Sequence, residues 1–537
     1  MIEHESHDSV TTENDRWLRG RRRLTRRALL RGAGRATVGA AGLALVGCGG
    51  DDDAPSLPPV AAEGSQDQPQ AAVEQQTVEQ QAADQQAPVE QQAAEQQAPA
   101  QQAAPEPDAE DTPAQVRRLL DPDRRCDDCT LEDPQFAAAF GSRVRFGIDD
   151  GAAWRMEVPP TWNGTLLLWG RGFSGLNDAG TAFNSRIGFG AFPFRELLLA
   201  AGIGWAASTY RSNGFVAAHG VDELLKTKDR FVSEFRTPST TVCVGASMGG
   251  ATAQLMAQEF PDEIDGALAL CGALSNVEVV DYLAAFHALA LYFIGEPPST
   301  TDSTGLNAWG ARLGSPDGAG GLALTPVGEQ FVAVVQELTG GERWGFEEGL
   351  AEQWQTNFAL GSTVWPLVML SGQALAPGSI VEHDASTVAF DTRALTYSAP
   401  ADSGIDIDAL NEQVIRFAAP DGSRENPALG PASGSLKVPL LTLKGTGDLF
   451  TPISLDQSYR RLVDAQGDSA NLVQRAVRRA GHCDFSTDES VAAFLDFAAW
   501  IAGGQPPQGE DLRGDLIQAG VAFTDPFDAG DPLAPGS

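Results

Sequence analysis

Short apolar runs recur between residues 143 and 477, and several contain no alternating polar position. Residues 165–169 read Thr-Leu-Leu-Leu-Trp and residues 240–244 read Thr-Thr-Val-Cys-Val. Such runs are typical of strands buried on both faces of a parallel sheet. We predict strands at residues 143–148, 154–158, 165–169, 204–209, 240–244, 266–270, 438–443 and 472–477.

Segments with helical patterning lie between several of these strands, at residues 194–201, 221–235, 251–260, 455–465 and 490–501. Strands that alternate with helices favour an α/β fold with a mostly parallel sheet flanked by helices. The alternation defines a core at residues 116–274 and 438–503.

The alternation stops across residues 275–437, which we predict to form a largely helical cap inserted into the core. This segment contains apolar helical stretches, such as 280–294 and 328–338, and scattered aromatic residues. Most of those aromatic side chains are expected to pack the cap onto the core, and some are candidates to line a substrate pocket.

The first 48 residues combine nine arginines within residues 16–35 with an apolar stretch at residues 36–47, which is about a dozen residues long and too short to span a bilayer. The stretch Leu24-Thr25-Arg26-Arg27-Ala28-Leu29-Leu30 resembles a twin-arginine signal, and Leu45-Val46-Gly47-Cys48 resembles a bacterial lipobox. This resemblance implies export, lipidation of Cys48 and anchoring to an envelope membrane on its periplasmic or cell-surface side. The alternative is a basic nucleic-acid-binding arm, which would need neither the apolar run nor the cysteine.

Residues 49–115 are rich in Gln, Ala, Glu and Pro, and no aromatic residue occurs between Leu18 and Gln135. Such a segment cannot bury enough apolar surface to offset the entropy of ordering, so we predict a disordered tether. The tail at residues 504–537 is rich in Pro, Gly and Asp, and is expected to wrap the surface or fray.

The formal net charge of the chain is -35. This charge disfavours nucleic acid and anionic membrane surfaces as partners. The simpler interpretation of the charge is solubility or adaptation to salt.

The strongest chemical signal is Gly245-Ala246-Ser247-Met248-Gly249, between a predicted strand and a predicted helix. This Gly-x-Ser-x-Gly pattern in that context is typical of a nucleophile elbow, where a sharp turn leaves no room for side chains at the two glycines. Ser247 is the candidate nucleophile. The amide of Met248, at the start of the helix, is the candidate oxyanion donor.

With its elbow and its alternation of strands and helices, the chain resembles the α/β-hydrolases, whose catalytic residues follow the order serine, acid, histidine. His287, His383 and His482 follow Ser247. The first two fall in the predicted cap, whereas His482 follows the last predicted strand, so His482 is the candidate base.

The candidate acid is Asp448, in the glycine-rich loop after the strand at residues 438–443. A separation of 34 residues from His482 leaves room for one helix and one strand, and the aspartate would hold the imidazole tautomer. Asp484 and Asp488 are weaker candidates, because they lie too close to His482 to come from the adjacent strand.

The second oxyanion donor is expected after an early strand, in Gly170-Arg171-Gly172-Phe173-Ser174-Gly175. This loop resembles the His-Gly-x loop of the α/β-hydrolases, with arginine where histidine is usual, and it makes the backbone N–H of Phe173 the candidate donor. Arg171 has an alternative role in binding an acidic group of the substrate. The resemblance implies no metal and no cofactor.

Five cysteines besides Cys48 fit an exported protein. Cys126 and Cys129 are expected to form a local disulfide, with a redox pair or half of a zinc site as alternatives. Cys243 is expected to be a free thiol in the core. A bridge between Cys271 and Cys483 would brace the histidine loop.

Together these features predict an exported, lipid-anchored serine hydrolase that cleaves carboxylic esters of small molecules or polymers. An amidase or peptidase with the same triad is the alternative within the enzymes. A non-catalytic binding lipoprotein on the same fold is the alternative outside them, although it would have no need of all three triad residues.

Overall fold

The computed structural model describes residues 134–149, 151–173, 194–211, 215–275, 277–295, 306–317, 321–354, 390–419, 424 and 430–525. The predicted signal, the tether, Cys48, Cys126, Cys129 and His383 lie outside these residues. The described residues between 134 and 525 belong to one compact unit.

The core of this unit is an eight-stranded sheet with the order β1-β2-β4-β3-β5-β6-β9-β10. The pairs β1–β2 and β2–β4 are antiparallel, and all others are parallel. The strands are β1 (Arg143–Asp149), β2 (Ala152–Val158), β3 (Thr165–Gly170), β4 (Gly204–Ser208), β5 (Thr240–Ala246), β6 (Gly266–Leu270), β9 (Leu440–Gly445) and β10 (Leu472–Val477). All eight strands predicted from the sequence are therefore present, and their ends shift by only one or two residues.

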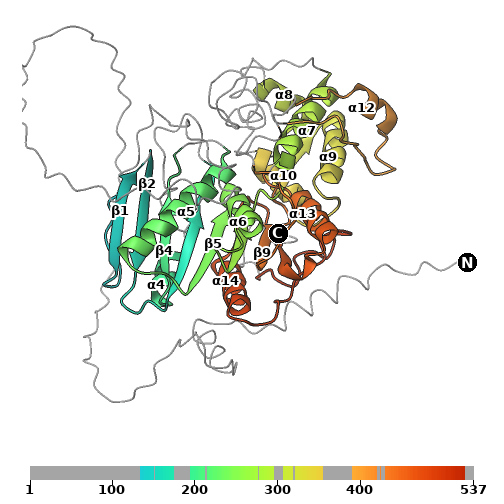
Figure 1. The fold of residues 1–537 in the computed structure, drawn as a ribbon. Coiled ribbons are helices and arrows are strands. Elements are labelled where there is room, and N and C mark those ends of the chain that lie inside the picture. The colour runs from blue at the N-terminus through green and yellow to red at the C-terminus, as the bar shows by residue number, and fades with distance from the viewer. Residues whose placement is uncertain are drawn as a thin grey trace, which may run out of the picture. The chain divides into compact units, whose positions relative to one another are not determined.

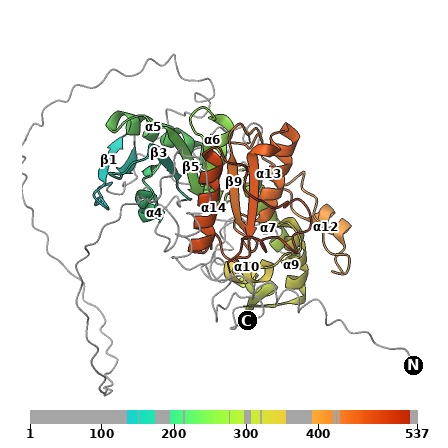
Figure 2. The same ribbon diagram turned by 90° about the horizontal axis from the view of Figure 1, so that it is seen from below.

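Helices cover both faces of this sheet (Figures 1 and 2). One face packs against α5 (Ala217–Glu234), α6 (Met248–Glu259) and α13 (Ile453–Gln466), and the other against α4 (Phe194–Ala200) and α14 (Thr487–Ile501). Along β3, Leu166 and Leu168 face the first layer, whereas Leu167 and Trp169 face the second. Successive side chains of a strand point to opposite faces, so burial on both sides explains the continuous apolar runs.

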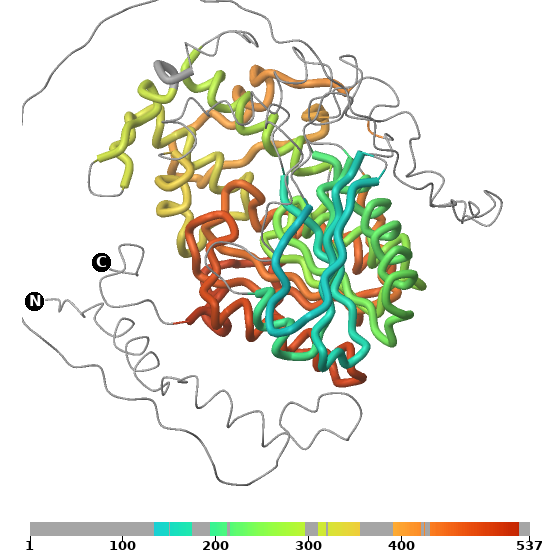
Figure 3. Tube along the Cα trace, turned by 90° about the vertical axis from the view of Figure 1, so that its left-hand side faces the viewer, coloured from blue at the N-terminus to red at the C-terminus, as the bar shows by residue number. Residues whose placement is uncertain are grey.

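The segment between β6 and β9 is mostly helical, and Figures 1 and 3 display its yellow-green to orange elements gathered away from β1 and β2. It contains α7 (Val277–Ile294), α8 (Leu306–Leu313), β7 (Gly314–Pro316), β8 (Leu322–Leu324), α9 (Pro326–Leu338), α10 (Phe346–Gln353) and α12 (Ile407–Gln413). We call this segment the cap. The predicted stretches 280–294 and 328–338 correspond to α7 and α9, whereas the hairpin of β7 and β8 was not predicted.

Helix α7 is long and apolar enough to cross a membrane by length and composition. It has a mean hydropathy of 1.6, but 83% of it is buried inside the protein. Side chains on all its faces are buried, including those of Tyr282, Phe286 and Leu289. This burial explains the apolar composition of α7, which is a core helix of the cap.

The part of the C-terminal tail that the structure describes packs against the core. Leu512, Leu516 and Ala519 are buried together with Ile453 of α13 and Ala476 of β10. Arg478, directly after β10, donates through its backbone N–H to Thr524 Oγ1 at 2.6 Å. The tail therefore supports the strand that precedes the histidine loop.

Candidate active site

Ser247 occupies the turn between β5 and α6, with φ 57° and ψ -122°. This backbone conformation is rare for a residue with a side chain and stores strain. Hydrogen bonds hold the turn in place: the Ser247 N–H donates to Leu270 O at 2.9 Å, and Ala273 N–H donates to Ser247 O at 3.1 Å. The end of β6 and the loop after it therefore fix the backbone that presents the hydroxyl.

The two glycines of the motif are required by close backbone packing. A Cβ on Gly245 would lie 2.1 Å from Gly249 O, and a Cβ on Gly249 would lie 2.0 Å from Gly170 O. Neither distance is compatible with a side chain at either position. The steric interpretation of the Gly-x-Ser-x-Gly pattern is thus confirmed, and it includes Gly170 at the end of β3.

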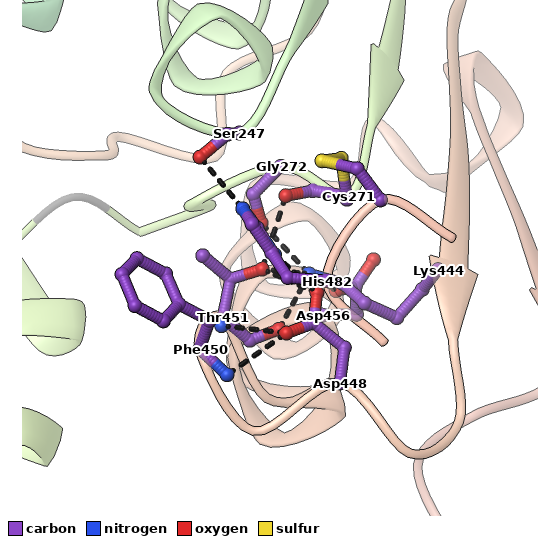
Figure 4. Close-up of a disulfide and its surroundings, with 10 residues drawn as sticks. Ser247, Cys271, Gly272, Lys444, Asp448, Phe450, Thr451, Asp456 and His482 are labelled. Atoms are coloured by element: carbon purple, nitrogen blue, oxygen red, sulfur yellow. Dashed lines mark hydrogen bonds and ion pairs between the residues drawn. A yellow bond between two sulfur atoms is a disulfide. The ribbon is translucent and has the colours of Figure 1, made fainter. Parts of the chain in front are cut away.

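The structure brings Ser247, His482 and Asp448 together in one hydrogen-bonded chain (Figure 4). His482 Nε2 lies 2.9 Å from Ser247 Oγ, and His482 Nδ1 lies 2.8 Å from Asp448 Oδ2. A carboxylate can only accept, so Nδ1 carries the proton that it shares with Asp448, and Nε2 is left to accept from the serine hydroxyl. The Phe450 ring lies 4.9 Å from the imidazole, centroid to centroid.

The Asp448 carboxylate is completely buried but well supplied with donors. Its Oδ1 accepts from the N–H groups of Phe450 at 2.8 Å and Thr451 at 3.1 Å, and its Oδ2 accepts from Thr451 Oγ1 at 2.9 Å. Burial alone would raise the pKa of Asp448, but the facing His482, the Lys444 ammonium and the Thr451 N–H together lower it below its ordinary value. The acid is therefore held ionised.

A disulfide joins Cys271 to Cys483, the residue after His482. The hypothesis of a bridge that braces the histidine loop is therefore confirmed as far as the pairing is concerned. The bridge ties the loop after β6, which holds the Ser247 backbone, to the loop that carries the imidazole. Cys243 is free and buried, as expected, and burial raises the pKa of its thiol.

The candidate oxyanion donors are the backbone N–H groups of Met248, in the elbow, and of Phe173, in the loop after β3. Met248 is the first residue of α6, where a helical N–H has no acceptor within the helix. Phe173 is half-buried at the end of the described part of its loop. This loop follows β3, whose last residue, Gly170, is in contact with Gly249. The amide of Phe173 remains a predicted donor.

The alternative role for Arg171, binding a substrate acid, is not supported by its contacts. Its side chain is fully buried, with Nε donating to Thr209 O at 2.6 Å and the guanidinium 4.4 Å from the centre of the Tyr210 ring. Burial lowers the pKa of Arg171 to about 10. Arg171 therefore holds the loops after β3 and β4 together inside the protein.

The cap contributes directly to the loop that carries the acid, which the sequence did not predict. Tyr282 Oη of α7 donates to Leu449 O at 2.7 Å, and the buried Arg343 donates through Nε to Thr446 O at 2.6 Å. A Cβ on Gly349 of α10 would lie 1.8 Å from Gly447 O. The backbone of α10 thus packs against the acid loop, and no local pattern marked these positions as part of the site.

Two acids near His482 do not take the place of Asp448. Asp484 is exposed, and Asp488 lies in the first turn of α14. Glu352 of α10 approaches from the cap: its carboxylate oxygens lie 3.0 Å from where a Cβ on Gly481 would stand. Burial and the charges of Asp484 and Asp448 raise the pKa of Glu352, a residue that the sequence analysis did not single out.

The sheet order, the helices on both faces and the serine on a turn after β5 define the α/β-hydrolase fold. The chain matches no protein-family model. It is similar to an o-phthalyl amidase of Xanthobacter agilis, with 23% identity over 404 residues, which cover 66% of this chain and 87% of that protein.

Among solved structures, the chain is similar to feruloyl esterase B from Aspergillus oryzae, with a TM-score of 0.39 and 12% identity over 69% of this chain and 82% of that one. It is also similar to Candida antarctica lipase A, with a TM-score of 0.35 and 11% identity over 70% of this chain and 78% of that one.

Proposed function

We propose that this protein is a serine hydrolase that cleaves a carboxylic ester through Ser247, His482 and Asp448. The observation that carries this proposal is the continuous hydrogen-bonded chain from the serine hydroxyl to a buried, ionised carboxylate. The strained turn at Ser247 supports it, because strain of this kind persists only where the surrounding structure holds it.

In the proposed reaction, Ser247 Oγ attacks the ester carbonyl while His482 Nε2 takes up the hydroxyl proton. Asp448 stabilises the resulting imidazolium through Nδ1. The N–H groups of Met248 and Phe173 stabilise the oxyanion of the tetrahedral intermediate. His482 then gives its proton to the leaving alcohol, and water, activated by the same imidazole, releases the acid and regenerates the serine.

The test is hydrolysis of p-nitrophenyl esters of graded acyl length by the full chain in detergent. We expect turnover by the parent protein and a loss of about a millionfold in kcat for Ser247→Ala, the size found when the nucleophile of such a unit is removed. Ser233→Ala is the matched control, because this exposed hydroxyl donates only to Arg230 O. Equal turnover by Ser247→Ala and the parent would contradict the proposal.

Amide cleavage is the second candidate, and one observation favours it: the relative from Xanthobacter agilis is an amidase. The same triad serves both bonds, since the protonated His482 can give its proton to the leaving amine of an amide as it does to the leaving alcohol of an ester. Matched p-nitrophenyl esters and p-nitroanilides with the same acyl group discriminate the two. An activated ester is intrinsically the more reactive of the two, so a serine amidase cleaves it as well. Turnover of the anilide that is lost in Ser247→Ala would therefore make the protein an amidase, and turnover of the ester alone would make it an esterase.

We further propose that the protein is exported and anchored through lipid on Cys48. The arginine-rich segment, the short apolar run and the cysteine at its end support this proposal. Partition into the detergent phase by the parent, but into the aqueous phase by Cys48→Ala, is the expected result. Identical partition of the two would contradict the anchor. The binding-lipoprotein alternative predicts anchoring without turnover of any ester or amide.

A further inference from the structure

A buried ammonium group, that of Lys444, contacts the loop that carries Asp448. Lys444 is at the end of β9, four residues before Asp448, and its side chain is completely buried. Burying a charge is costly unless it is paired and hydrogen-bonded. Packing alone therefore does not explain why a lysine occupies this position.

The hydrogen bonds of Lys444 connect two loops of the site (Figure 4). Its Nζ donates to Gly272 O at 2.8 Å, in the loop after β6, and to Thr451 O at 2.8 Å and Thr451 Oγ1 at 3.1 Å, in the loop after β9. Gly272 follows the disulfide cysteine Cys271. The ammonium thus holds the loop that supports Ser247 at a fixed distance from the loop that carries Asp448.

Asp456 of α13 supplies the balancing charge. Its Oδ2 lies 3.3 Å from Lys444 Nζ, an ion-pair distance without a well-aligned hydrogen bond, and its Oδ1 accepts from Thr442 Oγ1 at 3.1 Å. Burial raises the pKa of Asp456, and the Lys444 charge opposes that rise. The short contacts of Nζ are consequently those to the loops, with Asp456 acting mainly as a counterion.

The Thr451 hydroxyl connects the Lys444 ammonium to the Asp448 carboxylate. A hydroxyl has one proton, and Lys444 already donates to the Thr451 oxygen, so the Thr451 proton points to another acceptor. Two acceptors lie within reach: Asp448 Oδ2 at 2.9 Å and Cys271 O at 3.0 Å. The charged carboxylate is the stronger acceptor of the two. The lysine therefore orients the hydroxyl that bonds to the same carboxylate oxygen as His482 Nδ1.

We infer that Lys444 is a positioning residue, which acts through Thr451 to fix the Asp448 carboxylate against His482. The inference rests on the proposed function for its kinetic consequence, but the geometry it describes exists whether or not the protein turns over a substrate. Lys444 contacts no reacting atom, so its effect is expected in kcat and not in substrate binding.

The test compares Lys444→Met, Thr451→Val and the double variant with the parent, each corrected for its folded fraction by circular dichroism. We expect each single variant to lower kcat about tenfold or more, the worth of one hydrogen bond to a charged group, with KM within about twofold. The double variant is expected to lose no more than the larger single loss, because the two residues act in series. Thr451→Ser, which keeps the hydroxyl, should retain more activity than Thr451→Val.

A second readout does not depend on turnover. In protein labelled with ¹⁵N-histidine, the Nδ1–H proton of His482 reports the bond to Asp448 directly. We expect its resonance to shift or vanish in Lys444→Met and in Thr451→Val. Parental kcat together with an unmoved resonance, or losses that multiply in the double variant, would overturn the inference.

The two proposals fail in different ways. A parent chain without turnover contradicts the serine-hydrolase proposal, while the His482 resonance still tests the positioning role of Lys444. If Lys444→Met fails to fold, the inference is tested by comparing Thr451→Val with Thr451→Ser. Equal kcat and equal His482 resonances in those two variants would overturn the proposed role of the Thr451 hydroxyl.

Discussion

Ser247 Oγ and His482 Nε2 lie 2.9 Å apart although 235 residues separate them in the sequence. They meet because β5, β6, β9 and β10 are neighbouring parallel strands, whose carboxyl ends lie at the same edge of the sheet. Ser247 follows β5, Asp448 follows β9 and His482 follows β10. The topology therefore assembles the site.

Asp448→Asn tests the role of the carboxylate. An asparagine can donate to Nδ1 and so favours the wrong imidazole tautomer, from which we expect a fall of about 10⁴-fold in kcat. Steady-state ester hydrolysis measures it. The matched control is Asp484→Asn, an exposed acid two residues from His482. Equal losses in the two variants would contradict the assignment of the acid.

Gly249→Ala tests the steric origin of the elbow motif. The added Cβ would lie 2.0 Å from Gly170 O, a backbone atom that cannot move without displacing β3. We expect a loss of about 3 kcal/mol in the free energy of unfolding, measured in urea. Gly514→Ala is the control, because nothing lies within 4 Å of its Cβ position. Similar stability of the two variants would rule out this explanation.

Replacing Cys271 and Cys483 together by alanine removes the bridge between two loops of the site. The bridge spans 212 residues of sequence, so its loss should lower the free energy of unfolding by about 2 to 4 kcal/mol and also lower kcat, as the His482 loop loosens. Urea unfolding and ester turnover measure both. Peptide mapping of the parent that found both thiols free would contradict the bridge itself.

Burial of His287 in α7 should make the free energy of unfolding sensitive to acid. His287 is buried and stacked on Phe417, with ring centroids 6.5 Å apart, and burial lowers its pKa to about 4. The unfolded chain takes up this proton near pH 6.5, before the folded chain does, so stability is complete above that pH and falls as the pH drops toward 4. The loss attributable to this residue is up to about 3 kcal/mol.

Urea unfolding at pH 7, 5.5 and 4.5 measures this effect. His287→Phe, which keeps a ring beside Phe417, should flatten the pH dependence relative to the parent. An unchanged slope in the variant would show that other groups cause the acid sensitivity.

The strands of the core could be predicted because burial on both faces leaves a plain apolar run, as in Leu166, Leu167 and Leu168. The elbow could be predicted because backbone contact at Gly245 and Gly249 leaves a mark in the sequence. The candidate acid and base followed from their order along the chain and from the strands that precede them.

The supports of the site could not be predicted, because each depends on contacts between distant segments. Arg343 and Tyr282 reach the acid loop from the cap, and nothing in their local sequence differs from ordinary helix or loop. Lys444 continues an apolar strand and would ordinarily be expected at its solvent end, but it is completely buried and lies at ion-pair distance from Asp456 of α13. The burial of Arg171 has the same kind of cause, because its guanidinium lies against Thr209 and Tyr210 of the loop after β4.

Covalent labelling of the native full chain with a fluorophosphonate, followed by peptide mass mapping, tests directly whether Ser247 is an activated nucleophile. We expect one adduct, on Ser247, that is absent from Ser247→Ala and forms far more slowly in His482→Gln. No adduct on the folded parent, or an adduct on a different serine that persists in Ser247→Ala, would contradict this role of Ser247.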